Sequence, residues 1–396
     1  MKRSTRVNHP AAADLPADNH PVVAPIYQTV KFEFDTVEET LAALRGERAG
    51  YFYSRSANPT TRQLELTLAE LQGREDCLVC ASGVGVVAQT LLSLTQQGDH
   101  VLCFAETYGP TRGLIRRTLG KFGVTHTLLS IGDLPAIEQE LSGHPTRLIV
   151  FESPTNPVNR IADIGAITRL AREHGALTVL DNTFAGVHQH GRYDVDFYLH
   201  SLTKYVSGHG DVMGGAVIAN RALLRPLRAD FTVFGAVLDP HAAFLIQRGL
   251  KTYFLRYSAQ SSNALRVAEY LSTHPAAERV RYPGLPGDPQ HALACSQMSE
   301  FGAIVSFDLR GGLEAGRLFA EALQLFALTA SLGATESLVM PPQLLASRDL
   351  TEEQQRSAGI GPGTVRLSIG LEDIDDLLAD IAQALSAASA DLRSQD

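Results

Sequence analysis

In Leu199-His200-Ser201-Leu202-Thr203-Lys204-Tyr205, an apolar run ends in two hydroxyl groups and a lysine. A second run, Leu177-Thr178-Val179-Leu180-Asp181-Asn182, ends in an aspartate in the same way. Parallel strands of an α/β sheet bring their carboxyl ends to one edge, and ligands bind at that edge. We therefore expect the two runs to be neighbouring strands whose polar ends face one site.

Short apolar runs alternate with longer amphipathic segments from about residue 76 to residue 204. This alternation is typical of βαβ units and predicts an α/β fold with a mainly parallel sheet. The expected strands are Cys77–Ala81, His100–Phe104, Arg147–Glu152, Leu177–Asp181 and Val195–Ser201, and the expected helices are Val86–Leu94, Thr111–Leu119 and Ile164–Glu173.

The length of 396 residues predicts more than one domain, because single hydrophobic cores stop growing at roughly 250–300 residues. Residues 1–60 contain five prolines and little periodicity apart from a short helical pattern, which indicates an extended arm. Residues 61–250 form the expected large sheet domain. Residues 251–396 return to long helical patterns and predict a smaller C-terminal α/β domain.

The composition argues against several functions. With 34 Lys and Arg against 43 Asp and Glu, the net charge of -9 lacks the basic surface of a nucleic-acid or anionic-membrane binder. Four cysteines are too few for a disulfide framework and indicate a reducing compartment. No apolar stretch approaches the roughly 20 residues of a membrane span. We expect a cytoplasmic protein with neither a nucleic-acid nor a membrane partner.

The first chemical signal is Ser82-Gly83-Val84-Gly85-Val86-Val87-Ala88, which lies between a predicted strand and a predicted helix. Free backbone N–H groups and the helix dipole favour a phosphate at such a position. The same letters match the GxGxxG/A dinucleotide fingerprint. An NAD-dependent dehydrogenase is therefore one alternative, although it leaves Lys204 and Asp181 without roles.

Lys204, Asp181 and the phosphate-binding turn together indicate a different cofactor. Pyridoxal phosphate (PLP) enzymes need a lysine that forms an imine, an acid that pairs with the pyridinium nitrogen, and a phosphate cup. The hydroxyl groups of Ser201 and Thr203 add donors for the phosphate. The residues thus favour PLP chemistry over nicotinamide chemistry.

At these positions the chain resembles the PLP-dependent enzymes of cysteine and methionine metabolism, the trans-sulfuration family, which includes methionine and cystathionine γ-lyases. The resemblance runs from about Pro25 to Leu385. Its motifs are Tyr53-Ser54-Arg55, Asn58-Pro59-Thr60, Ala81-Ser82-Gly83, Tyr108-Gly109, Glu152-Ser153-Pro154-Thr155-Asn156-Pro157, Asp181-Asn182-Thr183, Ser201-Leu202-Thr203-Lys204-Tyr205 and Arg366-Leu367-Ser368-Ile369-Gly370. It implies the aspartate-aminotransferase-like fold, PLP fold type I.

The resemblance also implies residue roles. Lys204 holds PLP covalently and moves protons, Tyr108 stacks on the cofactor ring and assists proton transfer, and Asp181 pairs with the pyridinium. The implied phosphate ligands are Gly83, Val84, Ser201 and Thr203, joined by Tyr53 and Arg55 from a neighbouring subunit. The implied ligands of the substrate carboxylate are Asn156, Ser331 and Arg366. A site shared between subunits implies an active dimer, and the family implies a homotetramer of two such dimers.

Two positions that face the substrate depart from the family branches. Ala330 stands where cystathionine γ-lyases and γ-synthases usually carry glutamate, and Pro110 stands where methionine γ-lyases usually carry cysteine. We predict a carbon–sulfur lyase that eliminates or replaces at Cγ. Its predicted substrate is a homocysteine, cystathionine or methionine type of amino acid, or an O-acylhomoserine. β-Elimination, of the cystathionine β-lyase or cysteine desulfhydrase type, is the alternative.

No metal site is expected. Cys77 and Cys80 form a CxxC pair, but three residues apart on a strand they point to opposite faces, and no second pair exists. Both cysteines are therefore predicted to be buried core residues.

Overall fold

The structure is a computed structural model that describes residues 21–345 and 349–395. Its larger sheet has seven strands in the order β1-β7-β6-β5-β4-β2-β3, of which β7 is antiparallel to both neighbours and the others run parallel. The bounds are β1 Asp76–Cys80, β2 His100–Phe104, β3 Thr125–Leu129, β4 Leu148–Glu152, β5 Leu177–Asp181, β6 Phe197–Ser201 and β7 Gly215–Ala219. The predicted mainly parallel sheet is confirmed.

The register of this sheet collects polar strand ends. Glu152 at the end of β4 pairs with Asp181 at the end of β5, and Asp181 pairs with Leu199 of β6. Because residues of one strand alternate between faces, Leu199 and Ser201 lie on the same face of β6. The carboxyl ends of three neighbouring strands therefore present acids and hydroxyl groups at one edge.

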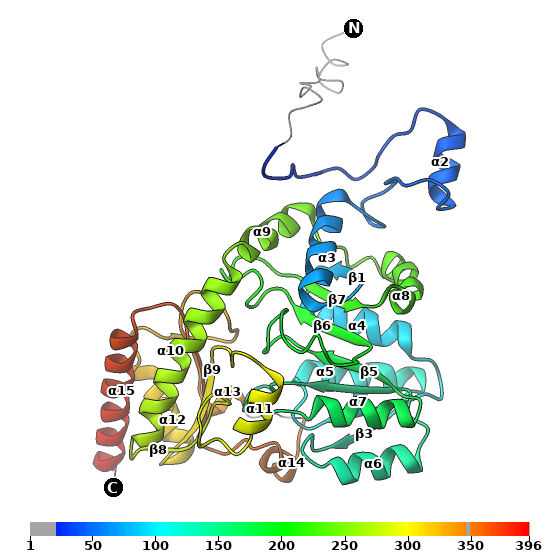
Figure 1. Cartoon of the computed structure of the whole chain (residues 1–396). Coiled ribbons are helices and arrows are strands. Elements are labelled where there is room, and N and C mark those ends of the chain that lie inside the picture. Colours follow the sequence, from blue (N-terminus) through cyan, green and yellow to red (C-terminus); the bar gives the residue numbers. More distant parts are fainter. Residues whose placement is uncertain (1–20, 346–348, 396) are drawn as a thin grey trace.

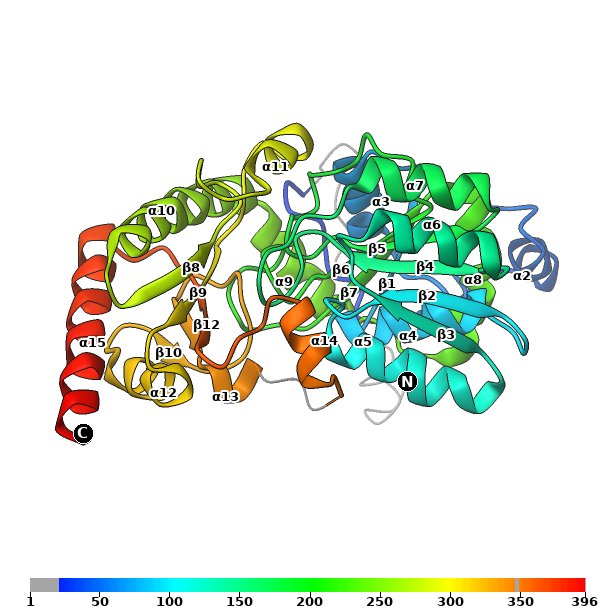
Figure 2. The same cartoon turned by 90° about the horizontal axis from the view of Figure 1, so that it is seen from below.

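Helices cover both faces of the larger sheet (Figure 2). One face packs on α3 (Pro59–Gln72), α6 (Leu134–Gly143) and α7 (Ile164–Glu173), and the other packs on α4 (Gly83–Leu94) and α8 (Arg221–Phe234). Cys77 belongs to the core on the first face and Cys80 to the core on the second. The expectation that the two cysteines are buried on opposite faces is confirmed.

The second sheet has the order β10-β11-β12-β9-β8. In β12 (Thr364–Ser368), Val365 and Leu367 enter the core, whereas Arg366 points the other way and contacts Asn156 of the larger half. The remaining strands are β8 Ala277–Arg281, β9 Ile304–Leu309, β10 Ala327–Leu328 and β11 Leu338–Met340. Its helices include α12 Gly312–Ala322, α13 Pro342–Leu345, α14 Glu352–Ser357 and α15 Ile374–Gln395.

Helix α10 (Tyr253–Thr273) joins the two halves (Figure 1). Tyr253 and Tyr257 in its first turns belong to the core of the larger sheet, whereas Val267 and Leu271 belong to the core of the smaller sheet. The two separate cores support a division into domains 61–250 and 251–396, which we keep as a proposal.

Ahead of α3, the chain forms an arm that stands away from the body of the molecule (Figure 1). Its helix α2 (Val37–Leu44) starts at Thr36, whose hydroxyl accepts a hydrogen bond from Glu39 N at 3.2 Å, and it buries no residue. Among the described helices, none combines the length and apolarity that a membrane span requires.

Candidate active site

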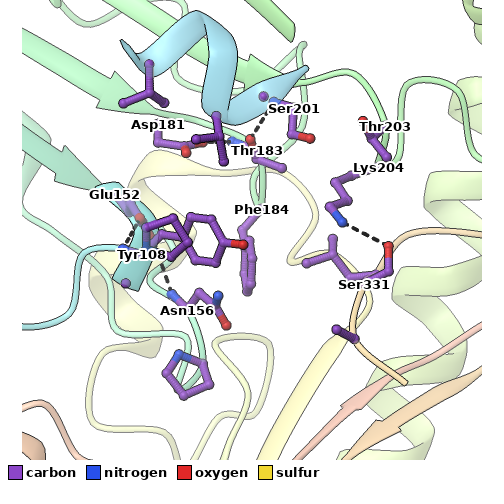
Figure 3. Close-up of a pocket in the computed structure, with 18 of the residues that line it drawn as sticks. Tyr108, Glu152, Asn156, Asp181, Thr183, Phe184, Ser201, Thr203, Lys204 and Ser331 are labelled. Carbon is purple, nitrogen blue, oxygen red and sulfur yellow. Dashed lines mark hydrogen bonds between the residues drawn. The ribbon is translucent and has the colours of Figure 1, made fainter. Parts of the chain in front are cut away.

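A cavity of about 520 Å³ opens at the carboxyl ends of β4, β5 and β6 (Figure 3). The smaller half closes it from the opposite side through the Ser331 turn and β12. Ten of the twelve residues expected in the site line this cavity: Gly83, Val84, Tyr108, Asn156, Asp181, Ser201, Thr203, Lys204, Ser331 and Arg366.

One end of the cavity could hold a phosphate. Helix α4 starts there, and its first helical hydrogen bond runs from Val86 N to Ser82 O at 3.0 Å, so the N–H groups of Gly83 and Val84 open the helix. A Cβ on Gly83 would lie 2.7 Å from the Ser201 Cβ. Only glycine leaves this cradle open beside the Ser201 hydroxyl.

Asp181 supplies a carboxylate without a cationic partner among the residues that the structure describes. It accepts one hydrogen bond from Thr183 N at 3.0 Å, and burial raises the pKa of its carboxyl group. A cation placed against it would lower that pKa again. A protonated pyridine nitrogen is such a cation.

Glu152 lies beside Asp181 and was not among the expected site residues. Its buried carboxyl group accepts hydrogen bonds from the backbone N of Tyr108 and of Asn156, the latter at 3.4 Å. Burial, and then the charge of Asp181, raise the pKa of Glu152 well above its usual range. Glu152 thus fixes the loops that carry two of the expected residues. A charged residue at the end of an otherwise apolar strand was the signal for it.

Lys204 follows β6 and projects into the cavity toward the turn of the smaller half (Figure 3). Its Nζ donates a hydrogen bond to Ser331 Oγ at 2.8 Å. Burial, and to a smaller extent the charge of Arg366, lower the pKa of Lys204 to about 8. About a tenth of the amine is therefore neutral at pH 7, far more than for an ordinary lysine, and both imine formation and proton abstraction require the neutral form.

Arg366 provides an anion site. Its buried guanidinium donates from Nη1 to Asn156 Oδ1 and from Nη2 to Ser331 O, both at 2.8 Å. Its Nε is buried and has no partner in the described part of the chain, and no acidic side chain pairs with the group there. Burial lowers the pKa of Arg366 to about 10, so the cation persists at neutral pH. A carboxylate ligand fits this charge and this vacant donor.

Tyr108 precedes the short helix α5 (Gly109–Gly113), and its ring reaches into the cavity (Figure 3). Burial first, and then the charge of Glu152, raise the pKa of its hydroxyl group. Phe184 and Thr183 line the cavity beside Asp181 but were missed, because nothing in their spacing distinguishes them from core residues.

Tyr53 and Arg55 do not reach this cavity. They lie on the arm, where the Arg55 guanidinium carbon sits 5.2 Å from the centre of the Tyr53 ring. Arg55 lines a separate hollow with Asn58 and Phe231. A role for the pair at a neighbouring subunit stays a prediction.

The residues of the cavity fit PLP. The glycine cradle has room for a phosphate, Asp181 has no cationic partner in the described part of the chain and could pair with a pyridinium, and Lys204 offers a partly neutral amine. Residues 5–386 match the family described as Cys/Met metabolism PLP-dependent enzymes. The chain belongs to this family.

Individual relatives agree with this assignment. The chain is 45% identical over 374 residues to an L-methionine gamma-lyase from Pseudomonas putida, covering 93% of each protein. It is 37% identical over 364 residues to an O-succinylhomoserine sulfhydrylase from Pseudomonas aeruginosa, covering 91% of this chain and 90% of the relative.

A solved structure of a Campylobacter jejuni protein, described as a putative O-acetylhomoserine (thiol)-lyase carrying N'-pyridoxyl-lysine-5'-monophosphate, is similar throughout. Its TM-score is 0.86 at 33% identity, and the match covers 92% of this chain and 96% of that one. Membership of a PLP-dependent family confirms the predicted cofactor, fold class and enzyme type, and it removes the dehydrogenase alternative.

The pKa of Lys204 gives a pH prediction. Lysine is charged below its pKa and only the neutral amine attacks an aldehyde, so covalent attachment of PLP to the apoprotein should accelerate as pH rises through about 8. Arg366→Gln removes the second cause of the lowering, and the midpoint should then move upward. The visible absorption of the attached cofactor measures the rate, with free Nα-acetyllysine as the control. An unchanged midpoint in the variant would contradict the electrostatic coupling.

Proposed function

We propose that the enzyme cleaves the Cγ–S bond of an amino acid with an uncharged thioether side chain, such as L-methionine. The products are 2-oxobutanoate, ammonia and a thiol, and one water molecule is consumed. The observation that carries this proposal is the lining of the cavity, which is mainly apolar. Its apolar members include Pro110, Met213, Ala330, Leu332, Met340, Leu344 and Ile360.

The two positions that depart from the family branches both line the cavity. Ala330 leaves no carboxylate beside Ser331 to bind the distal amino group of cystathionine, and Pro110 adds apolar surface behind Tyr108. Both changes favour a substrate whose side chain ends in carbon and sulfur. One relative is named L-methionine gamma-lyase, and methionine is a substrate of this kind.

In the proposed complex, Arg366 and Asn156 bind the substrate carboxylate. Arg366 reaches Ser331 through its Nη2, and Ser331 reaches Lys204 through its Oγ, so the carboxylate site and the base are two hydrogen bonds apart. A substrate held by its carboxylate therefore places its Cα near Lys204 Nζ.

When bound, PLP supplies an electron sink that stabilises negative charge next to the substrate amine. Lys204 Nζ, neutral in part because of its lowered pKa, takes the proton from Cα and then moves a proton at Cβ. The Tyr108 hydroxyl keeps its proton because its pKa is raised, and it is placed to give that proton to the departing sulfur. Gly83, Val84, Ser201 and Thr203 hold the phosphate in this proposal, and Asp181 keeps the pyridine nitrogen charged.

We further propose a site shared between subunits, within a homotetramer in the cytoplasm. The support is the arm, where helix α2 leaves Val37 72%, Leu41 43% and Leu44 57% exposed, a face that a second copy of the chain would cover. Arg55 and Tyr53 on the same arm then reach the phosphate of the neighbour. All four cysteines are free thiols, which suits a reducing compartment.

A substrate panel tests the reaction. The holoenzyme should release 2-oxobutanoate from L-methionine, and from L-homocysteine and L-cystathionine less efficiently, as identified by the keto acid formed. Lys204→Ala should lose the borohydride-trappable cofactor attachment and the lyase activity together, by roughly a thousandfold or more for removal of a base that is also the attachment point. Pyruvate alone, formed from L-cysteine or L-cystathionine, would show β-elimination and refute the proposal.

The shared site predicts that cofactor affinity depends on the arm. Arg55→Ala should raise the dissociation constant of PLP by roughly tenfold, since a charge-assisted hydrogen bond to phosphate contributes about 1.5–3 kcal/mol. Arg48→Ala is the matched control, because Arg48 lies on the same arm and forms an ion pair there with the partly exposed Glu39. Equal PLP affinity in the Arg55 variant and in the control would exclude the shared phosphate site.

A further inference from the structure

Arg112 is a buried cation that lines the cavity and has no role in the chemistry described above. It lies in α5, and its side chain is 4% exposed. Asp349 binds it bidentately, with Nε to Oδ2 at 3.0 Å and Nη2 to Oδ1 at 2.8 Å. The two residues are 237 positions apart in sequence, and the pair joins the larger half of the molecule to the smaller one.

The larger half fixes the position of the guanidinium. Arg112 Nη1 donates to the carbonyl oxygen of Ala105 at 2.8 Å and to that of Thr107. Both carbonyls belong to the turn between β2 and Tyr108. Backbone carbonyls therefore hold the Arg112 side chain on one side, and on the other its Nε and Nη2 donate to Asp349.

The segment from Asp349 to Ile360, which contains α14, lies against the larger half near α5 (Figure 2). Leu350, Ala358 and Ile360 form a small buried cluster with Ala105 and Val158 of that half. Ile360 also lines the cavity. Asp349 therefore anchors the start of a segment whose end forms part of the cavity wall.

We propose that the Arg112–Asp349 ion pair determines substrate specificity, because it occupies the one lining cation that could bind a carboxylate at the far end of a substrate side chain. The inference rests on the proposed function for the direction in which the substrate lies. With Asp349 in place, the pair selects substrates whose side chains end without charge. Arg112 acts as a specificity-determining residue and Asp349 as the residue that positions and neutralises it.

Physical chemistry supports this assignment. The cavity wall has four other charged residues. Asp181, Lys204 and Arg366 are assigned to the cofactor and the substrate, and Glu152 accepts hydrogen bonds from the backbone of Tyr108 and Asn156. A substrate with a distal carboxylate would have to displace Asp349 from a bidentate pair and also lose its own hydration. The side chain of Asp349 is 34% exposed, so substituting it creates no deeply buried cavity.

The test uses two substrates that differ at the far end only, O-acetyl-L-homoserine and O-succinyl-L-homoserine, and the ratio of their kcat/KM values. Asp349→Asn removes the carboxylate that neutralises the guanidinium, so the ratio should move toward the succinyl substrate by roughly tenfold, mainly through its KM. Arg112→Gln removes the cation and leaves the carboxylate of Asp349 near the wall. The ratio should then move in the opposite direction, toward the acetyl substrate.

Opposite shifts distinguish a specificity role from a structural one, because a loosened wall would affect both substrates alike in both variants. The double variant Arg112→Gln with Asp349→Asn should lose the gain toward the succinyl substrate. Glu314→Gln, which removes an exposed ion pair with Arg317 outside the cavity, is the matched control and should leave the ratio unchanged. Shifts in the same direction, or no shift in variants whose thermal unfolding midpoints match the wild type, would overturn the inference.

The outcome is independent of the methionine assay. If the wild-type enzyme forms no 2-oxobutanoate from L-methionine, the proposed function fails, while the ratio of the two O-acylhomoserines still reports on the ion pair. If the wild type does cleave L-methionine and the ratios do not diverge, only the specificity assignment fails.

Discussion

The site depends on the buried guanidinium of Arg366, which pairs with no carboxylate within residues 21–345 and 349–395. Arg366 is held by the side chain of Asn156 from the larger half and by the backbone of Ser331 from the smaller half. An unpaired buried cation is costly, and the cost falls when an anionic ligand binds. The same charge helps to lower the pKa of Lys204. In the proposed mechanism, Arg366 therefore both binds the substrate carboxylate and helps to activate the base, and this arrangement exists only when the two halves are packed together.

The larger sheet supplies the acidic side chains of the site through the arrangement of its strands. Parallel strands end at one edge, so Glu152 and Asp181 lie side by side. Burial, and then the charge of Asp181, raise the pKa of Glu152. Glu152 then serves as a structural acceptor, while Asp181 faces the cavity. The chain carries a net charge of -9 and still forms anion sites, because a helix start, a glycine cradle and one guanidinium act locally.

Much of this arrangement could be predicted from the sequence, because each strand is a short apolar run whose polar end can be recognised locally. The strands His100–Phe104 and Leu177–Asp181 and the helix Ile164–Glu173 have the predicted bounds. The expected helix Thr111–Leu119 is helical along its length, but only α5 is an α-helix. A π turn (Leu114–Thr118) and a 3-10 turn (Leu119–Phe122) follow it, in a stretch that glycines at 109, 113 and 120 make poor in helix formers. Strand β7 was missed because its glycine-rich approach resembles a loop. The Arg112–Asp349 pair could not be predicted from the sequence, because no local pattern links residues 237 positions apart.

The central claim concerns the direction in which the substrate lies, with its carboxylate on Arg366 and its side chain extending toward Arg112. A crystal structure of the holoenzyme with L-norleucine, which has the shape of methionine and no sulfur to eliminate, measures this directly. The account predicts the carboxylate in hydrogen-bond contact with Arg366 and Asn156, and the terminal methyl group among the apolar residues near Ile360. A carboxylate bound elsewhere, with Arg366 still contacting only Asn156 and Ser331, would contradict it.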